Sequence, residues 1–185
     1  VFLGCSATGM NVTSFKKPTD EELAHDFLWR VHKNTPAKGM IGIFNRSHYE
    51  DIIIQRVHKW IDEPCVINRI QAINAFEKLL QVDANTRILK FYFHISKEVQ
   101  LEKLRERLDN PAKNWKHNAG DWEEHKFWDE YMRCYQDAIN KTMAAPWEIV
   151  PADKRWYRDH VIANRILEEL QAMDPKLPVL DDEKK

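Results

Sequence analysis

The segment Phe44–Asp51 reads F-N-R-S-H-Y-E-D, and it stands between an apolar run over residues 40–44 and a helical pattern that begins at Tyr49. A continuous apolar run is typical of a central strand that is buried on both faces. In α/β proteins, ligands bind just beyond the carboxyl ends of such strands. The polar side chains of this segment therefore predict a phosphate and metal site at the edge of a parallel sheet, formed by Asn45, Arg46, Glu50 and Asp51.

Ordinary structural roles remain open for most of these side chains. Ser47 and Glu50 are three residues apart at a helix start, which fits a reciprocal cap, and the helix dipole favours Asp51 there. Arg46 is harder to explain structurally, because a guanidinium next to a buried strand needs a partner and a phosphate would be a bidentate one. Asn45 is neutral where phosphate-loop enzymes usually have a carboxylate that handles magnesium, so Glu50 or Asp51 would have to supply that charge.

The rest of the chain alternates between strand-like and helix-like segments, an order that predicts a parallel sheet covered by helices. Strands are expected over residues 11–15, 40–44, 87–95 and 147–150. Helices are expected over residues 19–32, 49–61, 66–80, 96–110, 121–141 and 153–173, with capping patterns at Thr19–Glu22 and Asp121–Glu124 and a cap at Asp153. The predicted fold class is α/β: a single domain over residues 1–174 with a parallel sheet covered by helices, and a polar tail over residues 175–185.

A second basic segment, Lys103–Lys116, reads K-L-R-E-R-L-D-N-P-A-K-N-W-K. Most charge runs of this kind are solvated helix faces. Here, however, Pro111 must end the helix, and further basic residues follow in the turn. A helix followed by a basic turn is typical of a mobile lid over phosphates. The candidate substrate-binding cations of this lid are Lys103, Arg107, Lys113 and Lys116.

Composition argues against several classes of protein. The 185 residues suffice for one domain with a full core, and a net charge of −1 gives no overall attraction to nucleic acid or acidic membranes. We therefore expect neither nucleic acid nor a membrane as a partner, and no apolar run approaches the roughly 18 residues of a membrane span. Three widely spaced cysteines fit neither a disulfide framework nor a zinc site, which favours a reducing, cytoplasmic location.

Three further features allow two interpretations each. Arg30 ends an amphipathic pattern, and it is equally suited to pointing into a cleft or to pairing with an acid. His48 lies inside the first motif, where a bond to a phosphate and a structural role are both open. The aromatic residues of the segment 128–139 recur at helical spacing, which is more typical of a core than of a base-stacking platform.

Several blocks of this sequence resemble the polyphosphate kinase 2 family, whose members use inorganic polyphosphate to phosphorylate nucleotides. The blocks cover nearly all of the chain in order, so the resemblance is specific. Besides F-N-R-S-H-Y-E-D they are H-D-F-L-W-R (25–30), H-I-S-K-E (94–98), R-L-D-N-P-A-K-N-W-K (107–116), W-D-E-Y (128–131) and A-P-W-E-I-V-P-A-D-K-R-W-Y-R (145–158). Asn45 with Glu50 and Asp51 resembles the subgroup that accepts both AMP and ADP, since other subgroups carry Asp at the position of Asn45.

The resemblance implies a three-layer α/β/α sandwich, a phosphate-loop kinase fold related to thymidylate kinase, with a helical lid over about residues 96–121. It implies that the four lid cations named above contact substrate, that Mg²⁺ is the cofactor, and that the ligands are inorganic polyphosphate and AMP, ADP or ATP. It also implies a homo-oligomer, a dimer or a tetramer. The metal ligands cannot be assigned from these motifs.

One departure from the family pattern is the absence of a glycine-rich phosphate loop and of the first strand before it. The five glycines of this chain form no such loop, so residues 1–185 alone are expected to be catalytically inactive. Two alternatives to a polyphosphate-dependent kinase follow. One is an ATP-dependent nucleoside monophosphate kinase on the same fold, and the other is a non-catalytic protein that binds polyphosphate or nucleotide.

Overall fold

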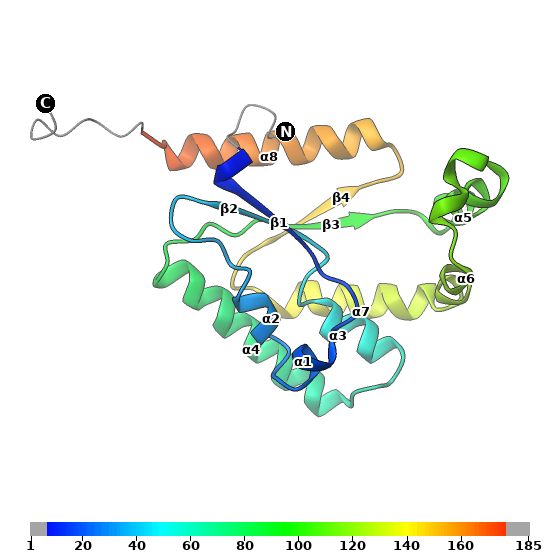
Figure 1. Cartoon of the computed structure of the whole chain (residues 1–185), viewed down its shortest axis with the longest axis horizontal. Coiled ribbons are helices and arrows are strands. Elements are labelled where there is room, and N and C mark those ends of the chain that lie inside the picture. Colours follow the sequence, from blue (N-terminus) through cyan, green and yellow to red (C-terminus); the bar gives the residue numbers. More distant parts are fainter. Residues whose placement is uncertain (1–6, 177–185) are drawn as a thin grey trace, which may run out of the picture.

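The structure of this protein is a computed structural model that describes residues 7–176. Strands and helices alternate along the chain (Figure 1). In chain order the elements are η1 (Ala7–Gly9), β1 (Met10–Ser14), α1 (Asp20–Leu23), α2 (Trp29–His32), β2 (Ile41–Asn45), α3 (Glu50–Val57), α4 (Glu63–Val82), β3 (Lys90–His94), α5 (Lys97–Asp109), η2 (Pro111–Lys116), α6 (Ala119–Lys126), α7 (Trp128–Lys141), β4 (Trp147–Pro151) and α8 (Arg155–Met173). Within this described part, every helix is too short or too polar to cross a bilayer.

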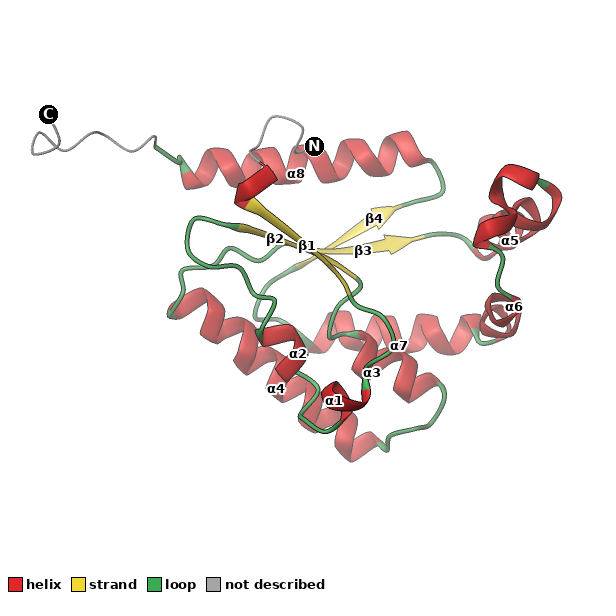
Figure 2. Cartoon of the chain, viewed as in Figure 1, coloured by secondary structure: helices red, strands yellow, loops and turns green. Residues whose placement is uncertain are grey.

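The strands form two parallel pairs. β1 pairs with β2, with Ser14 opposite Asn45, and β3 pairs with β4, with Lys90 opposite Trp147. Among the described residues no backbone ladder joins the two pairs. Helices α1 to α4 and α7 cover one side of the strands and α8 covers the other (Figure 2). The predicted α/β fold with parallel strands between two helical layers is confirmed. The absence of a first strand stays a prediction, and most of the predicted tail lies outside the described residues.

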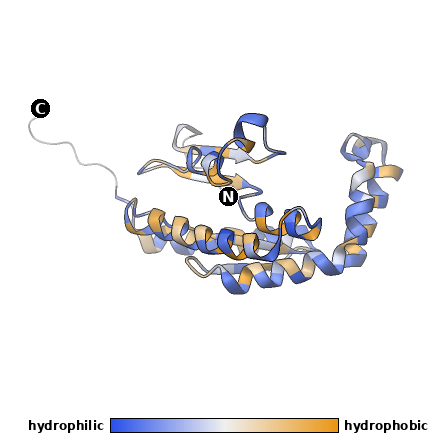
Figure 3. Cartoon of the chain, turned by 90° about the horizontal axis from the view of Figure 1, so that it is seen from below, coloured by the Kyte–Doolittle hydropathy of each residue, from blue (hydrophilic) through white to orange (hydrophobic). Residues whose placement is uncertain are grey.

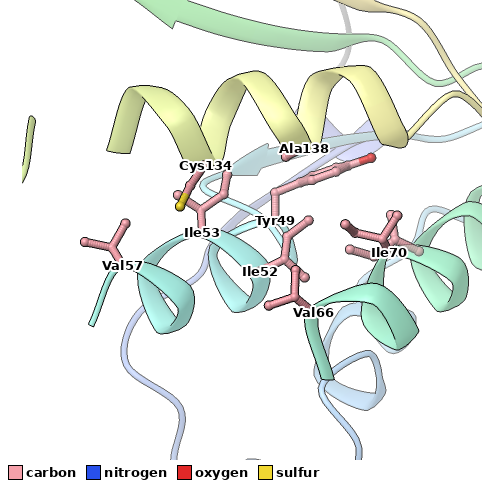
Figure 4. Packing of buried hydrophobic residues seen from close by; sticks show 9 residues of the cluster. Tyr49, Ile52, Ile53, Val57, Val66, Ile70, Cys134 and Ala138 are labelled. Carbon is pink, nitrogen blue, oxygen red and sulfur yellow. The ribbon is translucent and has the colours of Figure 1, made fainter. Parts of the chain in front are cut away.

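The main hydrophobic core lies between α3, α4 and α7 (Figure 4). Ile52 and Ile53 of α3 are almost fully buried there, against Val66 and Ile70 of α4 and Cys134 of α7. β-Branched side chains fill such space with few rotamers, which fixes the position of α3. Because α3 begins at Glu50, inside the F-N-R-S-H-Y-E-D motif, this core also fixes the position of Glu50 and Asp51.

The prediction of one helix over residues 19–32 is wrong, although its start is correct. Thr19 and Glu22 form the expected capping box. The helix then ends at Leu23, and a second short helix covers Trp29–His32. The Asp26 carboxylate accepts a hydrogen bond from the Leu28 backbone N–H at 3.0 Å, a local turn that competes with helical bonding.

Two other expected caps are also wrong. Asn118, not Asp121, caps α6, and the predicted single helix over 121–141 is divided at Phe127 into α6 and α7. Asp153 does not cap α8. Its carboxylate accepts a hydrogen bond from the Ser96 backbone N–H at 2.8 Å, so it ties the loop after β4 to the start of α5.

A buried polar cluster connects β3 to the helical layer below it; we call it the Lys90 cluster, and it consists of Tyr49, Glu77, Lys90 and Thr142. The Lys90 ammonium donates to the Tyr49 hydroxyl (2.8 Å), to Glu77 (2.9 Å) and to the Thr142 carbonyl (3.0 Å). The Tyr49 hydroxyl donates to the other Glu77 oxygen at 2.5 Å. The four residues come from four different elements or their ends, so the cluster holds those elements together.

Burial acts against both charges of this cluster. It opposes the ionised form of Glu77, but the contacts of His48, Tyr49 and Lys90 outweigh it, so the Glu77 pKa lies below its ordinary value. Burial also lowers the pKa of Lys90 and raises that of Tyr49. Three acceptors surround the ammonium, and on that geometry we assign the pair as ionised at neutral pH.

Candidate active site

Arg46 stands directly after β2 with a left-handed backbone, φ 63°. Such a conformation is sparsely populated by residues with a Cβ and costs on the order of 1 to 3 kcal/mol, so it persists where the surroundings hold it. The side chain is 58% exposed, and its Nε lies 3.3 Å from the Glu50 carboxylate. The strained turn therefore presents a guanidinium outward at the carboxyl end of a parallel strand, as the sequence predicts.

Asn45 is the last residue of β2, and its amide donates to the Ser14 hydroxyl at 3.4 Å. The Asn45 backbone carbonyl accepts from the Phe15 N–H at 3.1 Å, and the exposed side chain of Asn45 lies at the strand end. The reciprocal cap between Ser47 and Glu50, one of the roles left open by the sequence, is absent. The Ser47 hydroxyl accepts from the Tyr49 backbone N–H at 3.4 Å, and Glu50 turns towards Arg46 instead.

Asp51 and Arg30 form a buried pair behind this edge. The Arg30 Nη2 lies 3.6 Å from the Asp51 Oδ2, and the Arg30 Nη1 donates to the Lys16 carbonyl at 2.9 Å. Of the two roles open to Arg30, the structure therefore shows the pairing with an acid. The Asp51 Oδ1 accepts from Gln55 at 2.7 Å, whereas its Oδ2 is buried without a hydrogen bond. Burial raises the pKa of Asp51, and the Arg30 and Arg69 guanidinium groups offset part of that effect.

Glu50 carries a carboxyl group whose charge the fold disfavours. Burial raises its pKa, Arg46 opposes this, and the neighbouring Asp51 adds to it. A carboxyl with a raised pKa contributes stability at low pH and loses that contribution as the pH rises through its pKa in the folded protein. Two adjacent acids held partly out of water are typical of sites that receive a cation or a proton.

We expect Glu50→Gln to remove one pH-dependent contribution to the free energy of unfolding. Because ionised Glu50 is disfavoured in the fold, the free energy of unfolding of the wild type, relative to the variant, should increase as the pH falls from 7 towards 4. Urea unfolding at both pH values measures this difference. Glu106→Gln is the control of opposite sign, because the Lys113 ammonium lowers the Glu106 pKa. A constant difference between wild type and Glu50→Gln at the two pH values would contradict the prediction.

The predicted lid is a protruding arm, which consists of α5, η2 and α6 (Figures 1 and 3). It is largely hydrophilic and stands apart from the helical layers (Figure 3). Arg107 pairs with Asp121 at 2.5 Å, and Lys113 pairs with Glu106. Lys103 and Lys116 form no ion pair with any described residue, and the Lys116 ammonium lies 4.8 Å from the centre of the exposed Trp115 ring.

The site residues predicted from sequence thus fall into three groups. Asn45, Arg46 and Glu50 come together at the end of β2, with Asp51 and Arg30 buried behind them. The four lid cations stand on the arm. No group of three potential metal ligands occurs among the described residues, so the structure offers no protein-only metal cage. Sequence reasoning missed the Lys90 cluster, because a strand of alternating apolar residues gave no reason to bury a lysine.

A cation and paired acids at the carboxyl edge of parallel strands, with a basic arm beyond them, fit a protein of the phosphate-loop kinase type. Comparison with known proteins identifies the group within this class. The sequence profile of the family described as polyphosphate kinase 2 matches residues 5–178. The chain belongs to the polyphosphate kinase 2 family.

Individual relatives agree with this assignment. An AMP/ADP-polyphosphate phosphotransferase of Meiothermus ruber is 44% identical over 96% of this chain and 67% of its own length. An ADP-polyphosphate phosphotransferase of Rhodopseudomonas palustris is 36% identical over 96% of this chain and 66% of its own length. The crystal structure of polyphosphate kinase 2 from Arthrobacter aurescens superposes with a TM-score of 0.92 at 44% identity, over 95% of this chain and 62% of that one. The chain therefore spans about two thirds of the length of these relatives.

Proposed function

We propose that the full-length protein is a polyphosphate-dependent nucleotide kinase, which transfers the terminal phosphoryl group of inorganic polyphosphate to AMP, ADP or both. The observation that carries this proposal is the joint presence of the strained, outward-facing Arg46 and the basic arm beyond it. The names of the relatives support the choice of substrates. We propose the cytoplasm as its location and a homo-oligomer as its assembly.

Positioning and charge neutralisation dominate the mechanism, because phosphoryl transfer leaves little covalent work for the protein. Arg46 would hold the transferred phosphoryl group through its guanidinium fork. The arm would place Lys103, Arg107, Lys113 and Lys116 along the donor chain. Arg30 would act indirectly, since it holds Asp51 and the end of β1 together behind the site.

We further propose Mg²⁺ as the cofactor. Mg²⁺ is commonly held by one or two carboxylates together with substrate phosphates, which fits a site that has no three-ligand cage among its described residues. Glu50 is the accessible acid of the pair and would contact the ion. Asp51, buried behind it, would act indirectly through its negative charge. When bound, the metal neutralises phosphate charge.

A donor comparison tests the proposal. Full-length protein is supplied with AMP and Mg²⁺, with either polyphosphate or ATP as the donor, and phosphorus NMR detects the products. We expect ADP and ATP to form with polyphosphate. Product with ATP alone would instead favour an ATP-dependent nucleoside monophosphate kinase, and binding without turnover would favour a non-catalytic protein.

We expect Arg107→Ala and Lys116→Ala to weaken the polyphosphate reaction with little loss of stability. Both side chains are partly or fully exposed on the arm, so neither change leaves a buried cavity. Loss of a charge-assisted phosphate contact costs about 1.5 to 3 kcal/mol, which is roughly 10-fold to 100-fold in kcat/KM. Steady-state kinetics at several salt concentrations measure this. Lys126→Ala, which removes a lysine from an exposed pair with Glu123, is the control. Wild-type kinetics for the Arg107→Ala and Lys116→Ala variants would show that both residues are ordinary surface charges.

A further inference from the structure

The arm joins the rest of the molecule at two points, one at each of its ends (Figure 1). At the start of α5, the Ser96 backbone N–H donates to the Asp153 carboxylate at 2.8 Å. At the other end, α6 stops and α7 starts at Phe127, whose φ of −89° and ψ of 15° lie outside the helical range, and α7 starts without a side-chain cap. Hinges are commonly residues at the ends of elements, so the angle of the arm depends on what holds this second junction.

One carboxylate of the arm bonds across this junction. Glu124 is in the last turn of α6, and the His58 Nε2 lies 3.0 Å and 3.2 Å from its two oxygens. The Tyr131 hydroxyl donates to one of these oxygens at 2.6 Å. His58 caps the end of α3 and Tyr131 is in α7, so Glu124 connects the arm to two helices outside it. Among the described residues, the other side-chain hydrogen bonds and ion pairs of α6 stay within the arm.

The partners of Glu124 are themselves held in place. The His58 ring stacks on Trp60, with the ring centres 4.9 Å apart, and lies edge-on to the hinge residue Phe127 at 5.4 Å. Burial raises the pKa of Tyr131 and the bond to Glu124 adds to the rise, so the hydroxyl keeps its proton and remains a donor. Glu124 is 44% exposed, and exposed pairs contribute little to the stability of a whole fold. A small free energy is nevertheless enough to shift the populations of two arm positions.

The helix α3 connects this junction to the strand-end site after β2. It starts with Glu50 and Asp51 and ends at Val57, directly before His58. Its eight residues rise about 12 Å, and the hydrophobic core holds it through Ile53 and Val57. The helix that fixes the two acids of the site therefore also positions a partner of Glu124, so the arm and the site are held by the same rigid element.

We propose that His58, Glu124 and Tyr131 form a latch, which holds the arm at a fixed angle to α3 and so keeps the arm cations in register with the strand-end site. Glu124 is then a positioning residue, because it acts on polyphosphate only through the arm. The catalytic consequence rests on the proposed function. The latch itself is a property of the fold, and it can be measured without any substrate.

Hydrogen exchange of the full-length protein tests the latch directly. In Glu124→Ala and His58→Leu we expect the amides of α5 and α6 to exchange about 3-fold to 10-fold faster, because a charge-assisted but partly exposed contact is lost. The amides of α3 and α4 should keep their wild-type rates. Glu123→Ala is the matched control, since it removes the neighbouring carboxylate of the same helix, which pairs only with Lys126, and it should leave the arm unchanged. Wild-type exchange in the arm of both latch variants, or faster exchange throughout the chain, would overturn the proposal.

Kinetics with a conservative variant separate positioning from a role in folding. When only a fraction of molecules has a competent arm, the apparent affinity falls by that fraction, so His58→Leu should raise the KM for polyphosphate about 3-fold to 10-fold and keep kcat at saturation within about twofold. His58→Gln retains an N–H donor towards Glu124, and we expect it to restore most of the wild-type KM. A fall in kcat with an unchanged KM, or equal defects in the two variants, would contradict the positioning role.

The two experiments fail independently of the proposed function. If the protein shows no turnover with polyphosphate but Glu124→Ala loosens the arm and Glu123→Ala does not, the latch stands and the proposed reaction fails. If polyphosphate turnover is observed and the arm of Glu124→Ala exchanges at the wild-type rate, the reaction stands and the latch fails.

Discussion

The Arg46→Gly variant is expected to lose kinase activity by about 100-fold or more while keeping its stability. Removal of a preorganised group that stabilises transition-state charge costs roughly 2.7 to 4 kcal/mol in other enzymes. The fold, however, gains from the change, because glycine adopts the φ of 63° at this position without strain. Relief of that strain offsets the larger entropy of the unfolded glycine chain, so the free energy of unfolding should stay equal or rise by up to about 1 kcal/mol.

Lys59→Gly is the matched control for this experiment. Lys59 is also an exposed basic residue with a left-handed backbone, φ 57°, but it lies beyond the end of α3 and outside the strand-end site. We expect the same effect on urea unfolding and no effect on kcat. If Arg46→Gly retained kinetics within about threefold of the wild type, Arg46 would be an ordinary surface cation in a strained turn.

The Lys90→Met variant is expected to lose about 3 to 5 kcal/mol of the free energy of unfolding. Removal of one partner from a buried ion pair leaves the other charge uncompensated, which is the main cost of such changes. Lys90 is 6% exposed and Glu77 is 2% exposed, so little water can replace the lost contact. A loss of this size is a large part of the roughly 5 to 15 kcal/mol that stabilises a typical domain.

Two further variants isolate the cause of that loss. Lys126→Met removes a lysine from an exposed pair with Glu123, and we expect a change below about 0.5 kcal/mol. The double variant Glu77→Gln with Lys90→Met leaves neither charge buried, so it should recover part of the stability lost by Lys90→Met alone. A double variant that is less stable than the single one would show that packing, and not the unpaired charge, determines the effect.

Much of the fold was predictable because its periodic signals are local. The apolar run before Asn45 and the capping box at Thr19 each depend on a few neighbouring residues, and both the strand and the box appear in the structure. The expected burial of that strand on both faces is wrong, because β2 pairs with β1 alone among the described residues and its side chains are half-buried or exposed.

The errors in the helices have a common cause. Asp26, Asp121 and Asp153 can each bond to several groups, and the helical pattern alone does not select among them. Asp26 bonds locally to Leu28, whereas Asp121 and Asp153 bond to Arg107 and Ser96, which are distant in the sequence.

The candidate site was predictable to a similar extent. The position of Arg46 follows from a strand end, but its left-handed backbone has no signature in the sequence, since no glycine or asparagine marks it. Arg30 and Asp51 are 21 positions apart, and their pairing depends on how α2 packs beside α3. The Lys90 cluster was out of reach for the same reason, because its members come from segments that only the folded chain brings together.

The ion pairs on the arm separate the affinity of a polyphosphate contact from its salt dependence. Condensed counterions leave the polymer when a cation neutralises its phosphates, and each such contact steepens the dependence of affinity on salt. Arg107 and Lys113 already have carboxylate partners in Asp121 and Glu106, so a phosphate at either position must displace an internal anion and gains less affinity. All four cations would then count towards the slope, while Lys103 and Lys116 would supply the larger share of the affinity.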